Sequence, residues 1–118
     1  MNNKMNIMTH SNPLAMNLHG LTSLRGNITP ASQLLKTLGN PDRLLLLCKL
    51  AEGEMNVGEL EESLQIVQPT LSQQLGVLRR EGLVGTRRDG RQMFYRIGNS
   101  SVLVMLQTLC HLHAKMPE

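Results

Sequence analysis

Residues 57–97 read VGELEESLQIVQPTLSQQLGVLRREGLVGTRRDGRQMFYRI, with a regular spacing of leucines in the first half. The leucines recur at three- and four-residue steps, which indicates two short amphipathic helices that each bury one face. They are Leu60, Leu64, Leu71, Leu75 and Leu78. Between the two groups, Ile66, Val67 and Gln68 leave room only for a tight turn. A short helix, a tight turn and a longer helix form the helix-turn-helix pattern.

The second half of this stretch predicts a β-hairpin. Residues 83–88 and 92–97 are separated by a turn that contains Asp89 and Gly90. This pair is a strong hairpin signal, because glycine readily adopts the positive φ that a two-residue loop needs. Neighbouring side chains of a strand point to opposite faces, and Phe94 is expected to face the core. The order of helices and hairpin predicts a mainly α fold with a β-hairpin, the winged helix-turn-helix.

Two helices are expected before this stretch. The first opens at Pro30, because the missing N–H of proline would lack a partner at a helix start anyway, and a Gly-Asn-Pro sequence ends it. The second begins near Pro41 or Asp42 and continues to Gly53. Its nearly unbroken apolar run, LLLLCKL, predicts a helix that lies in the centre of the domain.

A last helix is expected from about Asn99 to Lys115, with Asn99 or Ser100 as its cap. Its apolar residues are Val102, Leu103, Met105, Leu106, Leu109, Cys110 and Leu112. One small winged helix does not need so much apolar surface, and spare apolar surface at a chain end implies a partner. We therefore expect a two-fold homodimer in which the first and last helices pair, because closed dimers are the commonest oligomers.

The domain organisation follows from composition. Residues 1–28 are predicted to be a mobile N-terminal tail, because they show no helical or strand period and are rich in Asn and Met. Residues 29–118 then form one DNA-binding and dimerisation domain. No apolar run approaches the ~18 residues of a membrane span, and the start lacks the form of a signal peptide. We expect a cytoplasmic chain with no membrane partner, whose two cysteines are thiols.

Positive charge is concentrated at the hairpin, although the net charge is only +3. The arginines there are Arg79, Arg80, Arg87, Arg88, Arg91 and Arg96. Residues 42–62 are mainly acidic, so the basic surface lies on one side, as phosphate binding requires. Arg87, Arg88 and Arg91 surround the turn and are expected to touch phosphates or the minor groove. A solvated, charged strand pair is the alternative.

The second helix of the helix-turn-helix is expected to enter the major groove of double-stranded DNA. With its leucines facing inward, the side chains left for a partner are amides and hydroxyls. The candidate DNA-binding residues are Gln68, Thr70, Ser72, Gln73 and Gln74. Glutamine can pair with adenine through two hydrogen bonds, and serine or threonine can reach bases or phosphates. Ordinary exposed polar positions are the alternative. A dimer would present two such helices to a pseudo-palindromic operator.

Residues 34–97 resemble the ArsR/SmtB family of bacterial winged-helix repressors. The motifs that carry the resemblance occur in order: an NPxRLxIL-type second helix, the VGEL helix, the QPTLSQQLxxLRxxGLV recognition helix and a wing that ends in FYR. The resemblance implies a homodimer with four helices, two strands and a final helix, whose repression is lifted when a ligand or modification reaches it. Metal-sensing relatives carry ELCxCDL in the third helix. Asn56 and Gly58 stand where those thiolates would be, so that metal site is absent.

Within the family, the sequence is most similar to the sulfide- and persulfide-responsive branch typified by BigR and SqrR. That branch carries one Cys in the second helix, which Cys48 matches, and another near the end of the last helix. A gapless alignment from Phe94 puts the second at Ala114, four residues beyond Cys110. One helical turn shifts a sulfur by ~5 to 6 Å along the helix axis, which could forbid a direct disulfide. A short deletion before the last helix could restore the position. The resemblance implies redox sensing by Cys48 and Cys110, with a reactive sulfur species as inducer and no cofactor.

The sequence leaves three other classes of function to consider. A metal-responsive repressor could use Cys110 and His113, which lie three residues apart on one helix, although two ligands do not make a site. A protein-only interaction module is a second alternative, because winged helices also bind proteins. An enzyme is not expected, because the sequence has no nucleophile elbow, phosphate loop or HExxH motif, and a domain of this size leaves little room for a substrate pocket.

Overall fold

The computed structural model describes residues 18–115. The chain divides into two units, Met1–Lys36 and Thr37–Glu118. Within the first unit lies α2 (Leu18–Gly26), where the sequence predicted no helix. Leucines recur at every third position of α2, but its two glycines are poor helix formers and hide the period. The expectation that residues 1–28 contain no helix is therefore wrong at α2, and residues 1–17 lie outside the described residues.

The next helix, α3 (Ile28–Leu38), begins two residues before the predicted start. Pro30 is then its third residue, still in the first turn, where a backbone N–H has no partner within the helix. The last two residues, Thr37 and Leu38, are buried and belong to the second unit. The predicted helix is thus confirmed, with a start that is slightly earlier.

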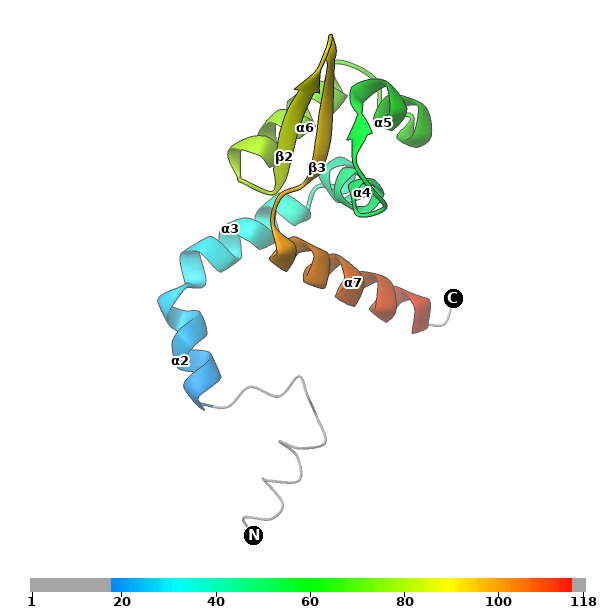
Figure 1. Cartoon of the computed structure of the whole chain (residues 1–118). Helices are drawn as coiled ribbons and strands as arrows, with labels where there is room; N and C mark the ends of the chain where they lie inside the picture. Colours follow the sequence, from blue (N-terminus) through cyan, green and yellow to red (C-terminus); the bar gives the residue numbers. More distant parts are fainter. Residues whose placement is uncertain (1–17, 116–118) are drawn as a thin grey trace. The chain divides into compact units, whose positions relative to one another are not determined.

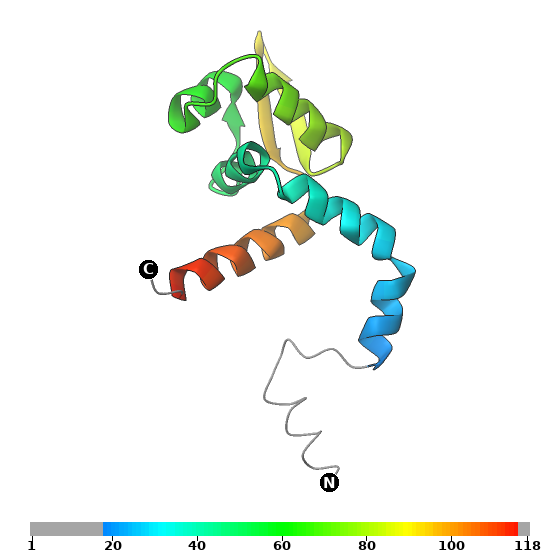
Figure 2. The ribbon, with the colours of Figure 1, turned by 180° about the vertical axis from the view of Figure 1, so that it is seen from behind.

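The helix α4 (Pro41–Leu50) lies in the middle of the second unit, between α7 and the helix-turn-helix (Figures 1 and 2). The Asn40 side chain caps it by accepting a hydrogen bond from the Arg43 backbone N–H at 3.1 Å. Its buried residues are Leu46, Leu47 and Leu50. The helix lies centrally, as the sequence predicts, but Leu45 is 49% exposed, so its apolar run is not buried on every side. The helix also ends three residues before Gly53.

The helix-turn-helix is confirmed as α5 (Val57–Leu64) and α6 (Thr70–Arg80). At the start of α5, Asn56 accepts from the Glu59 backbone N–H at 2.8 Å and Glu59 accepts from that of Asn56 at 2.9 Å. This reciprocal capping box satisfies two N–H groups that the helix itself cannot. Gln65 ends α5 in the left-handed conformation, with φ 58°. Four of the five predicted inward leucines, Leu60, Leu71, Leu75 and Leu78, are buried, whereas Leu64 at the end of α5 is only half-buried.

The hairpin is confirmed as β2 (Val84–Asp89) and β3 (Gln92–Ile97), which pair in antiparallel fashion. A third strand, β1 (Met55–Asn56), pairs with the other edge of β3 and gives the order β1-β3-β2. Two residues are too short to show a strand period, so the sequence could not predict β1. Phe94 and Tyr95 are both half-buried, which corrects the assignment of Phe94 alone to the core.

The last helix, α7 (Ser100–Lys115), follows β3, and the Asn99 side chain accepts from the Ser101 backbone N–H at 2.9 Å at its start. Val102 and Leu106 anchor α7 in the core, whereas Val104 is 62% exposed. The spare apolar surface predicted for this helix is therefore present in the single chain. None of the described helices combines the length and apolar character that crossing a membrane requires.

Candidate nucleic-acid interface and cysteine pocket

The exposed side of α6 begins with a local hydrogen-bond network. The Gln68 side-chain oxygen accepts from both the backbone N–H and the hydroxyl of Ser72, at 3.1 and 2.7 Å. Pro69 occupies the N-cap position and offers no side-chain bond, so Gln68 supplies the missing acceptor at the helix start. Two predicted reading residues are thus exposed and hold each other in place.

The other three predicted residues of α6 differ in their surroundings. Gln73 is exposed, and Thr70 is half-buried in the first turn. Gln74 is also half-buried, and its side-chain oxygen accepts a hydrogen bond from Arg43 Nη1 of α4 at 3.0 Å. The structure therefore leaves Gln73 on the outer surface and ties Gln74 to the interior of the second unit.

In the hairpin, Arg87 is held by an acid that the sequence analysis missed. Its Nε donates to Glu54 Oε1 at 2.8 Å, and its Nη2 lies 2.8 Å from the same oxygen. The guanidinium also lies 3.7 Å from Asp89 and 4.4 Å from the ring centroid of Phe94. The hydrogen bond to Glu54 raises the pKa of Arg87, so the group is a fixed cation. Glu54 directly precedes β1, and without β1 no sequence signal places it beside Arg87.

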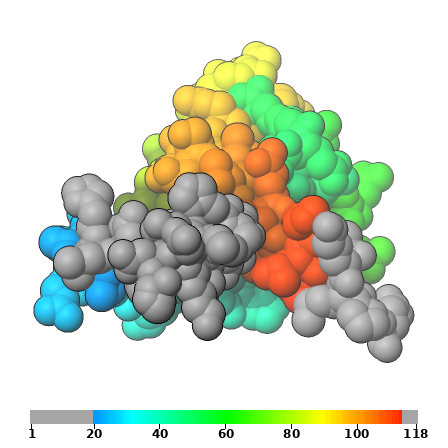
Figure 3. Space-filling view, turned by 90° about the horizontal axis from the view of Figure 1, so that it is seen from below, coloured from blue at the N-terminus to red at the C-terminus, as the bar shows by residue number. Residues whose placement is uncertain are grey.

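Arg88 and Arg91 lie at the exposed end of the hairpin. Within residues 18–115 no carboxylate lies within 4 Å of either guanidinium, in contrast to Arg87. The space-filling view shows the yellow tip of the hairpin as a projecting corner (Figure 3). Two arginines on such a projection are accessible to a phosphate backbone.

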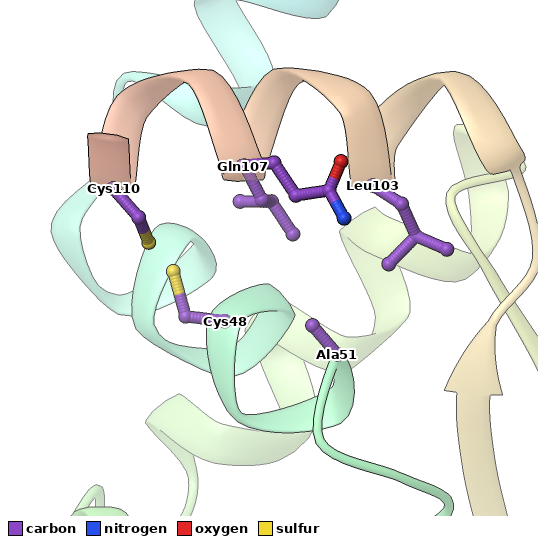
Figure 4. Close-up of a pocket in the computed structure, with 6 residues that line it drawn as sticks. Cys48, Ala51, Leu103, Gln107 and Cys110 are labelled. Atoms are coloured by element: carbon purple, nitrogen blue, oxygen red, sulfur yellow. The ribbon is translucent and has the colours of Figure 1, made fainter. Parts of the chain in front are cut away.

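Both cysteines line one pocket of about 350 Å³ between α4 and α7. Cys48 and Ala51 come from α4, and the remaining wall is formed by α7 through Leu103, Leu106, Gln107 and Cys110. Figure 4 shows the two sulfur atoms pointing toward one another across this space. The structure thus brings together the two predicted sensing residues, because the register of α7 against α4 sets Cys110 opposite Cys48.

The two thiols differ in accessibility. Both are free; Cys110 is exposed, and Cys48 is half-buried. Burial raises the pKa of the Cys48 thiol, and the nearby Cys110 raises it further. Since the thiolate is the nucleophile, the raised pKa of Cys48 slows its reaction with a molecule from solution, and its half-buried position limits access as well.

The alternative metal site has no further support in the described part of the chain. No group of three or more His, Cys, Asp or Glu side chains there could hold an ion. His113 is exposed on α7, three residues after Cys110.

Comparison with known proteins gives relatives over most of the chain. The "Biofilm growth-associated repressor" of Agrobacterium fabrum is 48% identical over 97 residues, which cover 82% of this chain and 83% of the relative. The "Transcriptional activator HlyU" of Vibrio cholerae is 39% identical over 95 residues, which cover 80% and 88%.

Solved structures agree with these matches. The crystal structure of the transcriptional repressor BigR from Xylella fastidiosa is 42% identical, with a TM-score of 0.74, and the match covers 87% of this chain and all of that one. Mb0332 of Mycobacterium bovis, described as a homodimeric winged helix-turn-helix DNA-binding domain, is 27% identical with a TM-score of 0.69, over 80% and 88%. Residues 40–86 match the family model "Bacterial regulatory protein, arsR family". The chain belongs to this family and is a winged helix-turn-helix transcriptional regulator that binds DNA.

Proposed function

We propose that the chain is a homodimeric repressor that binds a pseudo-palindromic operator and is released when Cys48 and Cys110 become bridged by sulfur. One observation carries the release mechanism: the two thiols face each other across the pocket between α4 and α7. Repression is favoured over activation because the 48% identical relative is a repressor. We expect the protein to act in the cytoplasm, where both DNA and reduced thiols are present.

DNA would be read by the exposed start of α6. Gln73 offers an unburied amide for a base edge, and the Gln68–Ser72 pair lies beside it at the helix N-terminus, where phosphates are favoured. Arg88 and Arg91 would contact phosphates or the minor groove from the hairpin tip. Most protein–DNA hydrogen bonds go to the backbone, so only a minority of these side chains need specify sequence.

The dimer would cover apolar side chains that the single chain leaves exposed. On α7, Val104 is 62% and Leu112 is 50% exposed, and on α3 the exposed fraction of Leu35 is 60%. Exposed leucines and valines on the first and last helices suit a symmetric contact, and the related Mb0332 domain is described as homodimeric. A two-fold axis would place two copies of α6 on the two halves of an operator.

The release chemistry needs a two-electron oxidant, and an organic trisulfide, RSSSR, supplies it. The Cys110 thiolate attacks the central sulfur, a Cys110–S bond forms, and RS⁻ leaves. The Cys48 thiol loses its proton and attacks that same central sulfur, which expels the second RS⁻ and leaves a three-sulfur bridge between the helices. Two thiolates are oxidised and the trisulfide is reduced to two thiolates, so atoms and electrons balance. Cys110 reacts first because it is the exposed thiol.

Bridging would reach the DNA-binding side through α4. This helix packs against both α5 and α6, so a covalent tie to α7 restrains the element on which the helix-turn-helix rests. A bridge that suits one arrangement of α4 and α7 better than another would shift a two-state equilibrium away from DNA binding.

The covalent step is tested by mapping the products of the treated protein. Purified, reduced chain would be mixed with glutathione trisulfide, digested and analysed by mass spectrometry. We expect a peptide pair linked through Cys48 and Cys110, and a mixed glutathione adduct that accumulates on Cys110 in the Cys48→Ser variant. If the adduct forms on Cys48 in the Cys110→Ser variant as fast as it forms on Cys110 in the Cys48→Ser variant, the proposed order is wrong. Absence of any link between the two cysteines of the wild type would rule out the bridge.

A further inference from the structure

A single guanidinium, that of Arg43 in the first turn of α4, joins three helices. Its Nε donates to the backbone carbonyl oxygen of Thr37 at the end of α3, at 2.7 Å. Its Nη1 donates to the side-chain oxygen of Gln74 in α6, at 3.0 Å. We call this set of contacts, Thr37–Arg43–Gln74, the Arg43 clamp.

The surroundings of the Arg43 clamp make it rigid. Thr37 is only 2% exposed, and both bonds of the guanidinium lie in a partly buried region. Asn40 holds the Arg43 backbone N–H at 3.1 Å, so the base of the side chain is fixed as well. Hydrogen bonds from a charged donor are stronger than neutral ones, and the planar fork fixes their directions. The clamp therefore defines how α6 is rotated about its own axis relative to α4.

Gln74 is poorly placed to read a base in this arrangement. Reading adenine through two hydrogen bonds requires the amide oxygen and the amide N–H₂ of one glutamine to face the same base edge. In Gln74 the oxygen is turned toward α4 and accepts from Arg43. Gln73, the preceding residue, is exposed, and its side chain makes no such contact within residues 18–115.

We infer that Gln74 is a positioning residue, which Arg43 uses to hold α6 in its DNA-binding orientation, and that Gln73 reads sequence in its place. The inference rests on the proposed reading of DNA by α6. It is independent of the sulfur bridge, because it concerns the reduced protein.

The test compares sequence preference with affinity under reducing conditions. In vitro selection from a random duplex library would be run with the wild type and with Gln74→Met, Gln73→Met and Arg43→Met. We expect Gln74→Met and Arg43→Met to bind the wild-type site about tenfold more weakly while they select the same bases. The double variant Arg43→Met/Gln74→Met should bind no more weakly than Arg43→Met alone, because Arg43→Met has already removed the bond between Arg43 and Gln74. Gln73→Met should select different bases at one or two positions of each half-site.

Distinct outcomes overturn distinct claims. If Gln74→Met changes the selected bases, Gln74 is a reader and the inference is wrong. If the losses of the two single variants multiply in the double variant, Arg43 and Gln74 act independently and the clamp is wrong. A wild-type chain that selects no sequence would overturn the reading of DNA by α6, and the clamp's role with it. Should Arg43→Met fail to fold, Arg43→Lys replaces it, because lysine keeps the charge and cannot make both bonds of the fork.

Discussion

At the scale of single residues, a basic side chain in a hairpin can already be engaged before DNA arrives. Arg87 was grouped with Arg88 and Arg91 by the sequence, and the structure separates it from them through Glu54. The side chain remains about half exposed, so a phosphate could compete with the carboxylate for it. Glu54 therefore reduces the charge that Arg87 offers to DNA.

This contact predicts that Glu54→Gln raises affinity for the operator. A neutral amide holds the Arg87 guanidinium less tightly than the Glu54 carboxylate does, so a DNA phosphate can bind it more easily. We expect the binding constant to rise about threefold at low salt. A plot of its logarithm against the logarithm of the salt concentration should become steeper by the slope of about one additional phosphate contact. The control is Glu52→Gln, which removes an acid paired with Lys49 at 3.0 Å and not with the hairpin. A fall in affinity for Glu54→Gln alone would show that Glu54 braces the hairpin and does not mask it.

The Cys48 thiol predicts how stability changes with pH. Its pKa is raised in the folded chain, chiefly by burial, so it keeps its proton at a pH where the unfolded chain has lost it. Above the pKa of the unfolded thiol the folded state binds more protons, and the free energy of unfolding must fall as pH rises. Urea unfolding between about pH 7 and about pH 10 should show this fall in the wild type and a smaller one in Cys48→Ser. Equal slopes in the two proteins would contradict it.

At the scale of elements, leucine spacing was enough to predict α5, α6 and the face that each buries. The apolar stripe of a helix can be identified from the spacing of residues within that helix, without knowledge of its partners. The sequence did not predict β1, because a strand of two residues is too short to show a period. It did not predict α2, because two glycines interrupt the weak helical period of its leucines. The pairings Gln68–Ser72 and Arg43–Gln74 were also beyond it, because side-chain partners depend on tertiary contacts that spacing does not encode. The placement of Cys48 and Cys110 in one pocket was expected only by resemblance, because which residues of α7 face α4 depends on how the two helices pack.

The capping box at the start of α5 predicts a measurable loss of stability. Asn56→Ala removes the acceptor of the Glu59 N–H and should cost about 1 kcal/mol in the free energy of unfolding. Asn56 also donates to Gln92 at 3.2 Å, so Gln92→Ala is the control that removes this contact and leaves the cap. Urea denaturation of both variants should show a clearly smaller loss for Gln92→Ala. Losses of equal size would mean that the cap contributes nothing.

At the scale of the whole molecule, the proposed dimer determines both operator symmetry and affinity. Val104 is mostly exposed in the single chain, so Val104→Glu adds a charge without disturbing the core. We expect this variant to sediment as a folded monomer and to bind the operator at least tenfold more weakly, because each half-site is then bound separately. Gln65→Glu adds the same charge at an exposed end of α5 and should leave the dimer intact. A Val104→Glu variant that stays dimeric would place the dimer contact elsewhere.

The most direct test of the account is the DNA affinity of the bridged protein. Chain in which mass spectrometry finds Cys48 and Cys110 fully linked would be titrated onto a selected operator by fluorescence anisotropy, beside the reduced chain at the same salt concentration. The account predicts that the bridged dimer binds at least tenfold more weakly, and that reduction with dithiothreitol restores the original affinity. A fully bridged dimer that binds the operator as tightly as the reduced one would contradict it.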